Sequence, residues 1–105
     1  MIIKTRAELV KKLLGEAQKI AYDKGKAYSD EDTLSNFKRN AERWNLTKYQ
    51  VWGVYFGKHI DCIQNAIKNT PEKPIDKTEG LKNRIIDAIN YLCILHCLLE
   101  EDNLK

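Results

Sequence analysis

Two stretches of this sequence are apolar on nearly every side of the helices that they predict. Residues 47–69 and 81–101 place hydrophobic side chains at helical intervals that wrap most of the circumference. A helix of this kind must be covered on most sides, and a chain of 105 residues has only a small core in which to bury it. The pattern therefore favours an all-α helical bundle that is completed by homo-oligomerisation.

A third long helix is expected near the N-terminus. Thr5 and Glu8 have the spacing of a capping box, and apolar residues follow at helical intervals as far as Tyr22. Gly25 is expected to end this helix, because glycine is a poor helix former. The β-branched residues follow helical spacing rather than alternation along the whole chain, so no strand is expected.

Local signals also mark the other helix ends. A short helix is expected to begin near Thr33 or Ser35 and to end at Asn45. Thr47 and Gln50 then repeat the capping-box spacing, which predicts that the first of the two apolar helices begins there. The expected fold is thus a bundle of three long helices and one short helix.

The chain is expected to form a single all-α domain over residues 1–105. Residues 70–80 contain both prolines and predict a loop between the two apolar helices. Residues 101–105 are polar and predict a frayed tail.

Charge and hydropathy limit the classes of partner. The formal net charge is only +3 and both signs are mixed along the chain, which argues against a nucleic acid partner. No apolar run reaches the ~18 residues that a membrane span needs, and the N-terminus lacks the apolar segment of a signal peptide. We therefore expect a cytoplasmic protein with no membrane partner.

Three cysteines, Cys62, Cys93 and Cys97, fall within the apolar helices. An odd number in such positions predicts reduced thiols that pack in the core. Cys93 and Cys97 lie four residues apart beside His96, but a metal site would need further ligands at loop spacings. We therefore expect no metal ion at these cysteines.

Polar side chains interrupt both apolar helices. Lys58 and Asp61 lie three residues apart and share one face of the first helix. The corresponding stripe on the second helix consists of Arg84, Asp87, Asn90 and Tyr91. If the two helices pack together, the two cations can pair with the two acidic side chains in a partly buried pocket.

Two interpretations of these stripes remain open. Buried ion pairs can fix the register of two helices. The same groups can form a site for an anionic ligand, with Lys58 and Arg84 as phosphate partners. Gly53 and Gly57 lie beside the first stripe, where each costs roughly 1 kcal/mol of helix stability. Their presence predicts close approach by a partner helix or a ligand.

The start of the short helix and the connector ahead of it add candidate ligand contacts. Asn36 and Phe37 place a side-chain amide beside an aromatic ring at the helix start. Such a pair can form hydrogen bonds to a nucleotide base and stack on it. Tyr28, in the connector ahead of this helix, is a third candidate.

Three motifs together resemble those of small phage proteins in the MazG-like, all-α NTP pyrophosphohydrolase superfamily. They are KGKAYSDEDTLSNF with the later AERW, then GKHIDCI, and finally RIIDAINYL, and the similarity covers residues 22 to 100. The resemblance implies a helical fold and a phosphorylated small molecule as partner, either a nucleotide or a nucleotide signal. For a phage protein it also implies the host cytoplasm as the place of action.

The enzymes of this superfamily bind Mg²⁺ through four carboxylates, in an E-x-x-E pair and an E-x-x-D pair on successive helices. The corresponding positions of this chain are Lys58 with Asp61 and Asp87 with Asn90. Two of the four carboxylates are therefore absent, and a lysine replaces one of them. Hard oxygen ligands are what Mg²⁺ requires, so this departure argues against catalysis while leaving nucleotide binding possible.

Three functions are consistent with these features. The first is a non-catalytic nucleotide-binding oligomer without a cofactor, such as a phage anti-defence protein that sequesters a nucleotide immune signal. The second is an Mg²⁺-dependent nucleoside triphosphate pyrophosphohydrolase that uses Asp61, Asp87 and a third carboxylate such as Glu42 or Glu79. The third is a structural or adaptor bundle without a ligand.

Overall fold

The structure is a computed structural model that describes residues 1–27 and 32–104. These residues form an all-helical fold with three long helices and one short helix, which confirms the predicted fold class. Its elements are α1 (Ile3–Ala27), α2 (Ser35–Trp44), α3 (Lys48–Asn69) and α4 (Leu81–Asn103). No strand occurs within these described ranges.

The turn between α2 and α3 follows the local signals of the sequence. Asn45 ends α2 in the left-handed conformation, with φ of 54°, a conformation that asparagine tolerates better than most residues. The next backbone N–H, that of Leu46, donates to the Ala41 carbonyl at 2.9 Å. Thr47 and Gln50 then form the predicted capping box, in which each side chain accepts a hydrogen bond from the other residue's backbone N–H.

Both predicted ends of α1 are wrong. The helix begins at Ile3, so Thr5 lies inside its first turn and does not serve as the N-cap. It also continues through Gly25 to Ala27. The reason is that a single glycine costs a helix only about 1 kcal/mol, which the residues on either side can offset.

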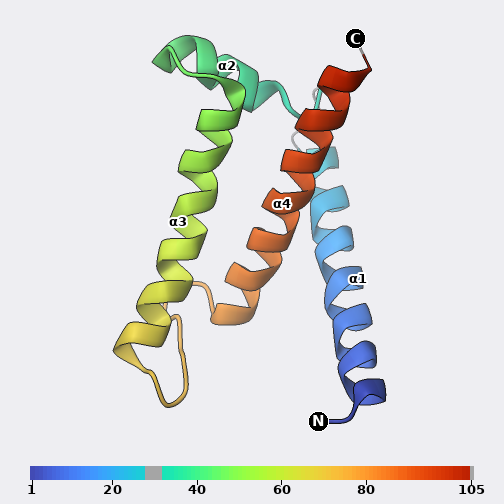
Figure 1. The fold of residues 1–105 in the computed structure, drawn as a ribbon, viewed down its shortest axis with the longest axis vertical. Helices are drawn as coiled ribbons and strands as arrows, with labels where there is room; N and C mark the ends of the chain where they lie inside the picture. Colours follow the sequence, from blue (N-terminus) through green and yellow to red (C-terminus); the bar gives the residue numbers. More distant parts are fainter. Residues whose placement is uncertain (28–31, 105) are drawn as a thin grey trace.

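The three long helices lie side by side with α4 in the middle. Figure 1 shows that α3 and α4 run antiparallel and are joined by the loop at residues 70–80, whereas α1 lies on the other flank of α4. The contacts between helices agree with this order, because α4 packs against both α3 and α1. The short α2 packs on α3 at the end remote from the loop. We call α3, α4 and their loop the hairpin.

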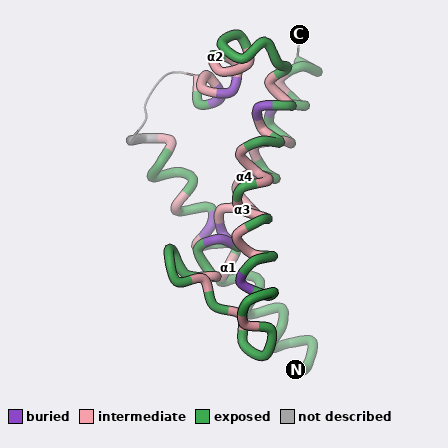
Figure 2. The backbone as a smooth tube through the Cα atoms, turned by 90° about the vertical axis from the view of Figure 1, so that its left-hand side faces the viewer, coloured by how far each residue is buried: buried purple, intermediate pink, exposed green. Residues whose placement is uncertain are grey.

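The core is small for a chain of this length, as the scarcity of buried backbone in Figure 2 shows. The buried apolar residues are Ala17, Leu34, Phe37, Val51, Ala66, Ile86 and Leu98. Many large hydrophobic side chains are exposed instead, on all three long helices. None of the described helices is long and apolar enough to cross a membrane.

The cysteines are less buried than predicted. Cys62 is half-buried, but Cys93 and Cys97 are exposed. The prediction relied on α4 being covered on all sides with the help of further copies of the chain, whereas the protomer alone covers only the flanks that meet α1 and α3. All three thiols are free in this structure.

Candidate functional site

The two polar stripes do not pair with each other as predicted. Lys58 and Asp61 are exposed on α3. Arg84 and Asp87 face the interior of the protomer and find other partners, so the expected pocket of two mutual ion pairs is wrong. The side chain of Arg84 is only 7% exposed and that of Asp87 18%. The reason is geometric, since residues three apart share a face but that face of α3 turns away from α4.

Arg84 is held by the loop that precedes α4. Its Nε donates to Asp76 Oδ2 at 2.8 Å, and one of its terminal nitrogens donates to Thr78 Oγ1 at 3.3 Å. Its other terminal nitrogen lies 3.4 Å from Glu79 Oε2 and 3.4 Å from His59 Nδ1. Each nitrogen of the guanidinium already has a neighbour in the protomer. Arg84 therefore fastens the loop at residues 70–80 to α4.

Asp76 is the acceptor at the centre of this loop. Its carboxylate accepts hydrogen bonds from the backbone N–H and the hydroxyl of Thr78 as well as from Arg84. The Thr78 hydroxyl and then the Arg84 guanidinium hold the pKa of Asp76 well below its usual range. The carboxylate therefore stays ionised, which keeps the loop closed on Arg84.

Asp87 is held more loosely. Its carboxylate lies 3.7 Å from Lys24 Nζ on α1 and 3.7 Å from His59 Nδ1 on α3. Both distances exceed the ~2.9 Å of a direct hydrogen bond. The oxygens of Asp87 can therefore accept hydrogen bonds from an incoming molecule.

Asp87 lines a cleft between α1 and α4. The cleft has a volume of about 290 Å³, at the lower end of the range for small-molecule sites. Its lining residues are Ile20, Lys24, Glu79, Asn83, Ile86 and Asp87. Two carboxylates, an amide and an ammonium group thus surround one small hollow beside the buried Arg84.

Asn90 and Tyr91 contribute to the fold. The amide nitrogen of Asn90 donates to the Ala17 carbonyl at 3.0 Å and so ties α4 to α1. The Tyr91 ring packs against the His59 ring, with 5.0 Å between the ring centroids. The backbone carbonyl of Tyr91 accepts a hydrogen bond from the Trp52 indole at 2.6 Å. Burial, and next the charge of Asp87, raises the pKa of the Tyr91 phenol.

The aromatic residue predicted as a base-stacking platform lies in the core. Phe37 is 3% exposed and packs edge to face with Tyr55 and Tyr91, so its ring is not accessible to a base in this conformation. Asn36, beside it in α2, is half-buried. Tyr28 lies outside the residues that the structure describes.

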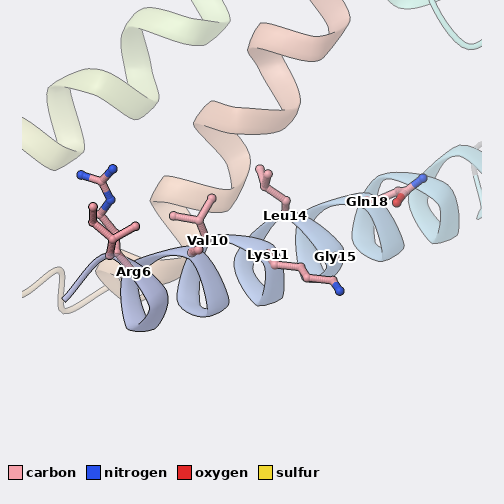
Figure 3. A pocket seen from close by; sticks show the side chains of 8 residues that line it. Arg6, Val10, Lys11, Leu14, Gly15 and Gln18 are labelled. Carbon is pink, nitrogen blue, oxygen red and sulfur yellow. The ribbon is translucent and has the colours of Figure 1, made fainter. Parts of the chain in front are cut away.

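A larger hollow lies along the N-terminal half of α1, as Figure 3 shows. Its volume is about 680 Å³, and its lining combines apolar side chains such as Val10 and Leu14 with Arg6, Lys11 and Gln18. All of its lining residues come from α1. None of the predicted site residues that the structure describes lies there, so it is an open flank of one helix rather than the candidate site.

The sequence interpretation missed Lys24, Asp76 and Thr78 as neighbours of these side chains, and it did not single out His59 as a site residue. The D-x-T spacing of Asp76 and Thr78 is a turn signal that could have drawn attention to the loop. Lys24 carried no such signal, because its neighbour Asp87 is brought there by helix packing alone.

The described residues do not bring three or more His, Cys, Asp or Glu side chains together in a group suited to a metal ion. Within the cleft, the charges of Glu79 and Asp87 are opposed by those of Lys24 and of Arg84 beneath it. Comparison of the chain with known protein families, with curated proteins and with solved structures finds no match.

Proposed function

We propose that this protein is a non-catalytic binder of a phosphorylated small molecule, a nucleotide or a nucleotide signal, with the cleft between α1 and α4 as its site. One observation carries the proposal. The largely buried Asp87 carboxylate lies between two cationic or potentially cationic groups without a direct hydrogen bond to either. Polar groups in such positions are enriched at binding sites, because a ligand can complete their hydrogen bonds.

The chemistry of the cleft supports a ligand with both an anionic end and hydrogen-bond donors. Lys24 is a mobile point charge that suits a phosphate group. Asp87 and Glu79 accept hydrogen bonds, as ribose hydroxyls and base amino groups require. With about 290 Å³, the cleft would enclose one part of a nucleotide and leave the rest at the surface. The exposed Lys58 remains a predicted second phosphate partner.

The resemblance to small phage proteins supplies a biological role by analogy. A protein that binds a nucleotide immune signal without converting it would lower the free concentration of that signal in the host. This anti-defence role is part of our proposal, and it requires tight binding rather than catalysis.

The Mg²⁺-dependent pyrophosphohydrolase is the second candidate, and a specific observation favours keeping it. Glu79 and Asp87, two of the carboxylates that this alternative would use, line the same cleft. Asp61 is exposed on α3 and is not one of the lining residues, and Lys24 and Arg84 oppose a cation at this place. Two carboxylates with two neighbouring cations suit an anion better than a divalent metal ion.

Calorimetric titration with nucleoside triphosphates and cyclic dinucleotides tests the proposal. We expect binding that survives EDTA and that weakens roughly tenfold in Lys24→Ala, because a charge-assisted contact to phosphate is lost. Lys19→Ala, an exposed lysine on the same helix, is the matched control and should bind like the native chain.

The same samples separate the alternatives. Pyrophosphate release in millimolar Mg²⁺ at an ordinary enzymatic rate would establish the hydrolase instead. Absence of binding to every nucleotide would leave the structural bundle, in which Arg84 and Asn90 only fix helix packing. Equal loss of affinity in Lys24→Ala and Lys19→Ala would place the ligand elsewhere on the surface.

A further inference from the structure

The hairpin has two sides, and only one of them is covered. Lys24 and Ala17 of α1 contact Asp87 and Asn90 on one side of α4. Lys38 of α2 reaches Glu101 on that same helix at 2.8 Å. Figure 2 shows the C-terminal end of α1 displaced to one side of α3 and α4. Among the residues that the structure describes, no helix packs on the opposite side of the hairpin.

Helix periodicity identifies the residues on the uncovered side. Each residue turns a helix by about 100°, so spacings of three and four residues keep side chains on one flank. On α4 this stripe is Ile85, Ile89, Leu92, His96 and Leu99. On α3 the corresponding stripe is Trp52, Phe56, Ile60, Ile63 and Ile67. Because the two helices run antiparallel, both stripes fall on the side away from the contacts of Lys24 and Asn90.

These ten residues, which we call the hairpin face, are apolar apart from His96 and are incompletely covered. Leu92 is 52% exposed, Leu99 48% and Ile67 49%. Trp52 and Phe56 stack with their ring centroids 4.7 Å apart, and both are only half-buried. The hairpin face contains no Asp, Glu, Lys or Arg. A continuous apolar surface of this kind marks an interaction site.

The total accessible surface indicates how much of the protomer is left without a packing partner. The protomer exposes 8166 Å², whereas a compact monomer of 12.2 kDa exposes about 6,000 Å². The radius of gyration is 15.9 Å against about 13 Å for a compact chain of this length. The excess of about 2,000 Å² per chain includes the open flank of α1 as well as the hairpin, and it is of the size that each subunit of an obligate dimer buries.

We propose that the occupant of the hairpin face is the same face of a second copy of this chain. Two hairpins packed face to face about a two-fold axis form a four-helix bundle, with α1 and α2 outside it. A surface without formal charge can meet its own copy without repulsion between like charges, which a two-fold interface requires. The stacked Trp52 and Phe56 provide the rigid aromatic anchors that such interfaces use.

The glycines of α3 have no packing role within the protomer. A Cβ atom placed on Gly53 or Gly57 would meet nothing within 4 Å. The protomer therefore gives no packing reason for two glycines in this helix, although each one destabilises it. Both glycines lie beside the hairpin face rather than in it, so the dimer does not depend on them. This dimer does not depend on the proposed ligand, because the cleft lies on the opposite side of α4.

Sedimentation equilibrium of the native chain and two variants tests the dimer. We expect the native chain at micromolar concentration to have twice the chain mass of 12.2 kDa. Leu92→Glu places a charge in the hairpin face and should weaken dimerisation by about 100-fold or more, while helical circular dichroism is retained. Val54→Glu is the matched control, because Val54 is 57% exposed on the opposite flank of α3 and should leave the dimer intact.

A second measurement decides the question even if Leu92→Glu does not fold. The urea midpoint of a native dimer rises with chain concentration, whereas that of a monomer does not. A monomeric native chain with a concentration-independent midpoint would overturn the proposal, as would a monomer that binds vesicles of phosphatidylcholine and phosphatidylglycerol. Equal dissociation by Leu92→Glu and Val54→Glu would show that the hairpin face is not the interface.

Discussion

At the scale of single residues, a polar group inside this protein either fixes the packing of its own chain or is available to a ligand. The spacing of residues in the sequence does not separate these two roles. Spacing correctly placed Arg84, Asp87 and Asn90 on the inner side of α4, because a shared face follows from helix geometry. It did not identify their partners, which lie in the loop, on α1 and on α3. Those partners depend on how separate segments pack, and no local pattern encodes that.

The acid dependence of stability follows from Asp76. Its pKa in the folded state is lowered from the ordinary value of 3.8. Its stabilising contribution is therefore fully present above about pH 5 and is lost progressively as the pH falls through 3.8 towards the lower folded-state pKa. We expect urea unfolding of Asp76→Asn, measured from neutral pH to about pH 3, to show a lower stability at neutral pH and a shallower decline towards acid. Glu72→Gln, an exposed change in the same loop, should decline like the native chain. Parallel declines in Asp76→Asn and the native chain would contradict this account.

At the scale of helices, the sequence predicted α3 and α4 well and α1 poorly. The ends with a specific hydrogen-bonding residue, Asn45 and Thr47, lie where they were expected. Thr5 and Gly25 gave misleading signals, because a helix continues past a weak boundary whenever the flanking residues favour it. The sequence predicted that one chain cannot cover α4 on all sides, but an all-round apolar pattern does not say which flank the protomer leaves open.

The two capping-box spacings allow a matched test of this reasoning. We expect Thr47→Ala to lower the free energy of unfolding by about 1 kcal/mol, because the Gln50 backbone N–H loses its acceptor. Thr5→Ala should change it little, because Thr5 is inside α1 rather than at its cap. Urea titration of both variants provides the comparison. No loss in Thr47→Ala would show that the cap at α3 does not contribute to stability. A similar loss in both variants would show that the effect of Thr47→Ala is not specific to the cap.

At the scale of the whole molecule, the two proposals use different sides of α4. The hairpin face is apolar and uncharged, whereas the cleft beside α1 combines Lys24, Glu79 and Asp87. A protomer that exposes 8166 Å² has surface to spare for a second copy without closing this cleft. Dimerisation would place the two clefts on the outside of one four-helix bundle, where each remains open to a small molecule.

Mass spectrometry of small molecules released by heating the native protein tests the central claim most directly. The protein is purified in the presence of Mg²⁺, and both the released compounds and those left in solution are identified. We predict a nucleotide or cyclic nucleotide that is recovered with its phosphate linkages intact, in an amount comparable to that of the protein. Recovery of only cleaved products with pyrophosphate, or of no phosphorylated compound from a chain that also binds none in titration, would contradict it.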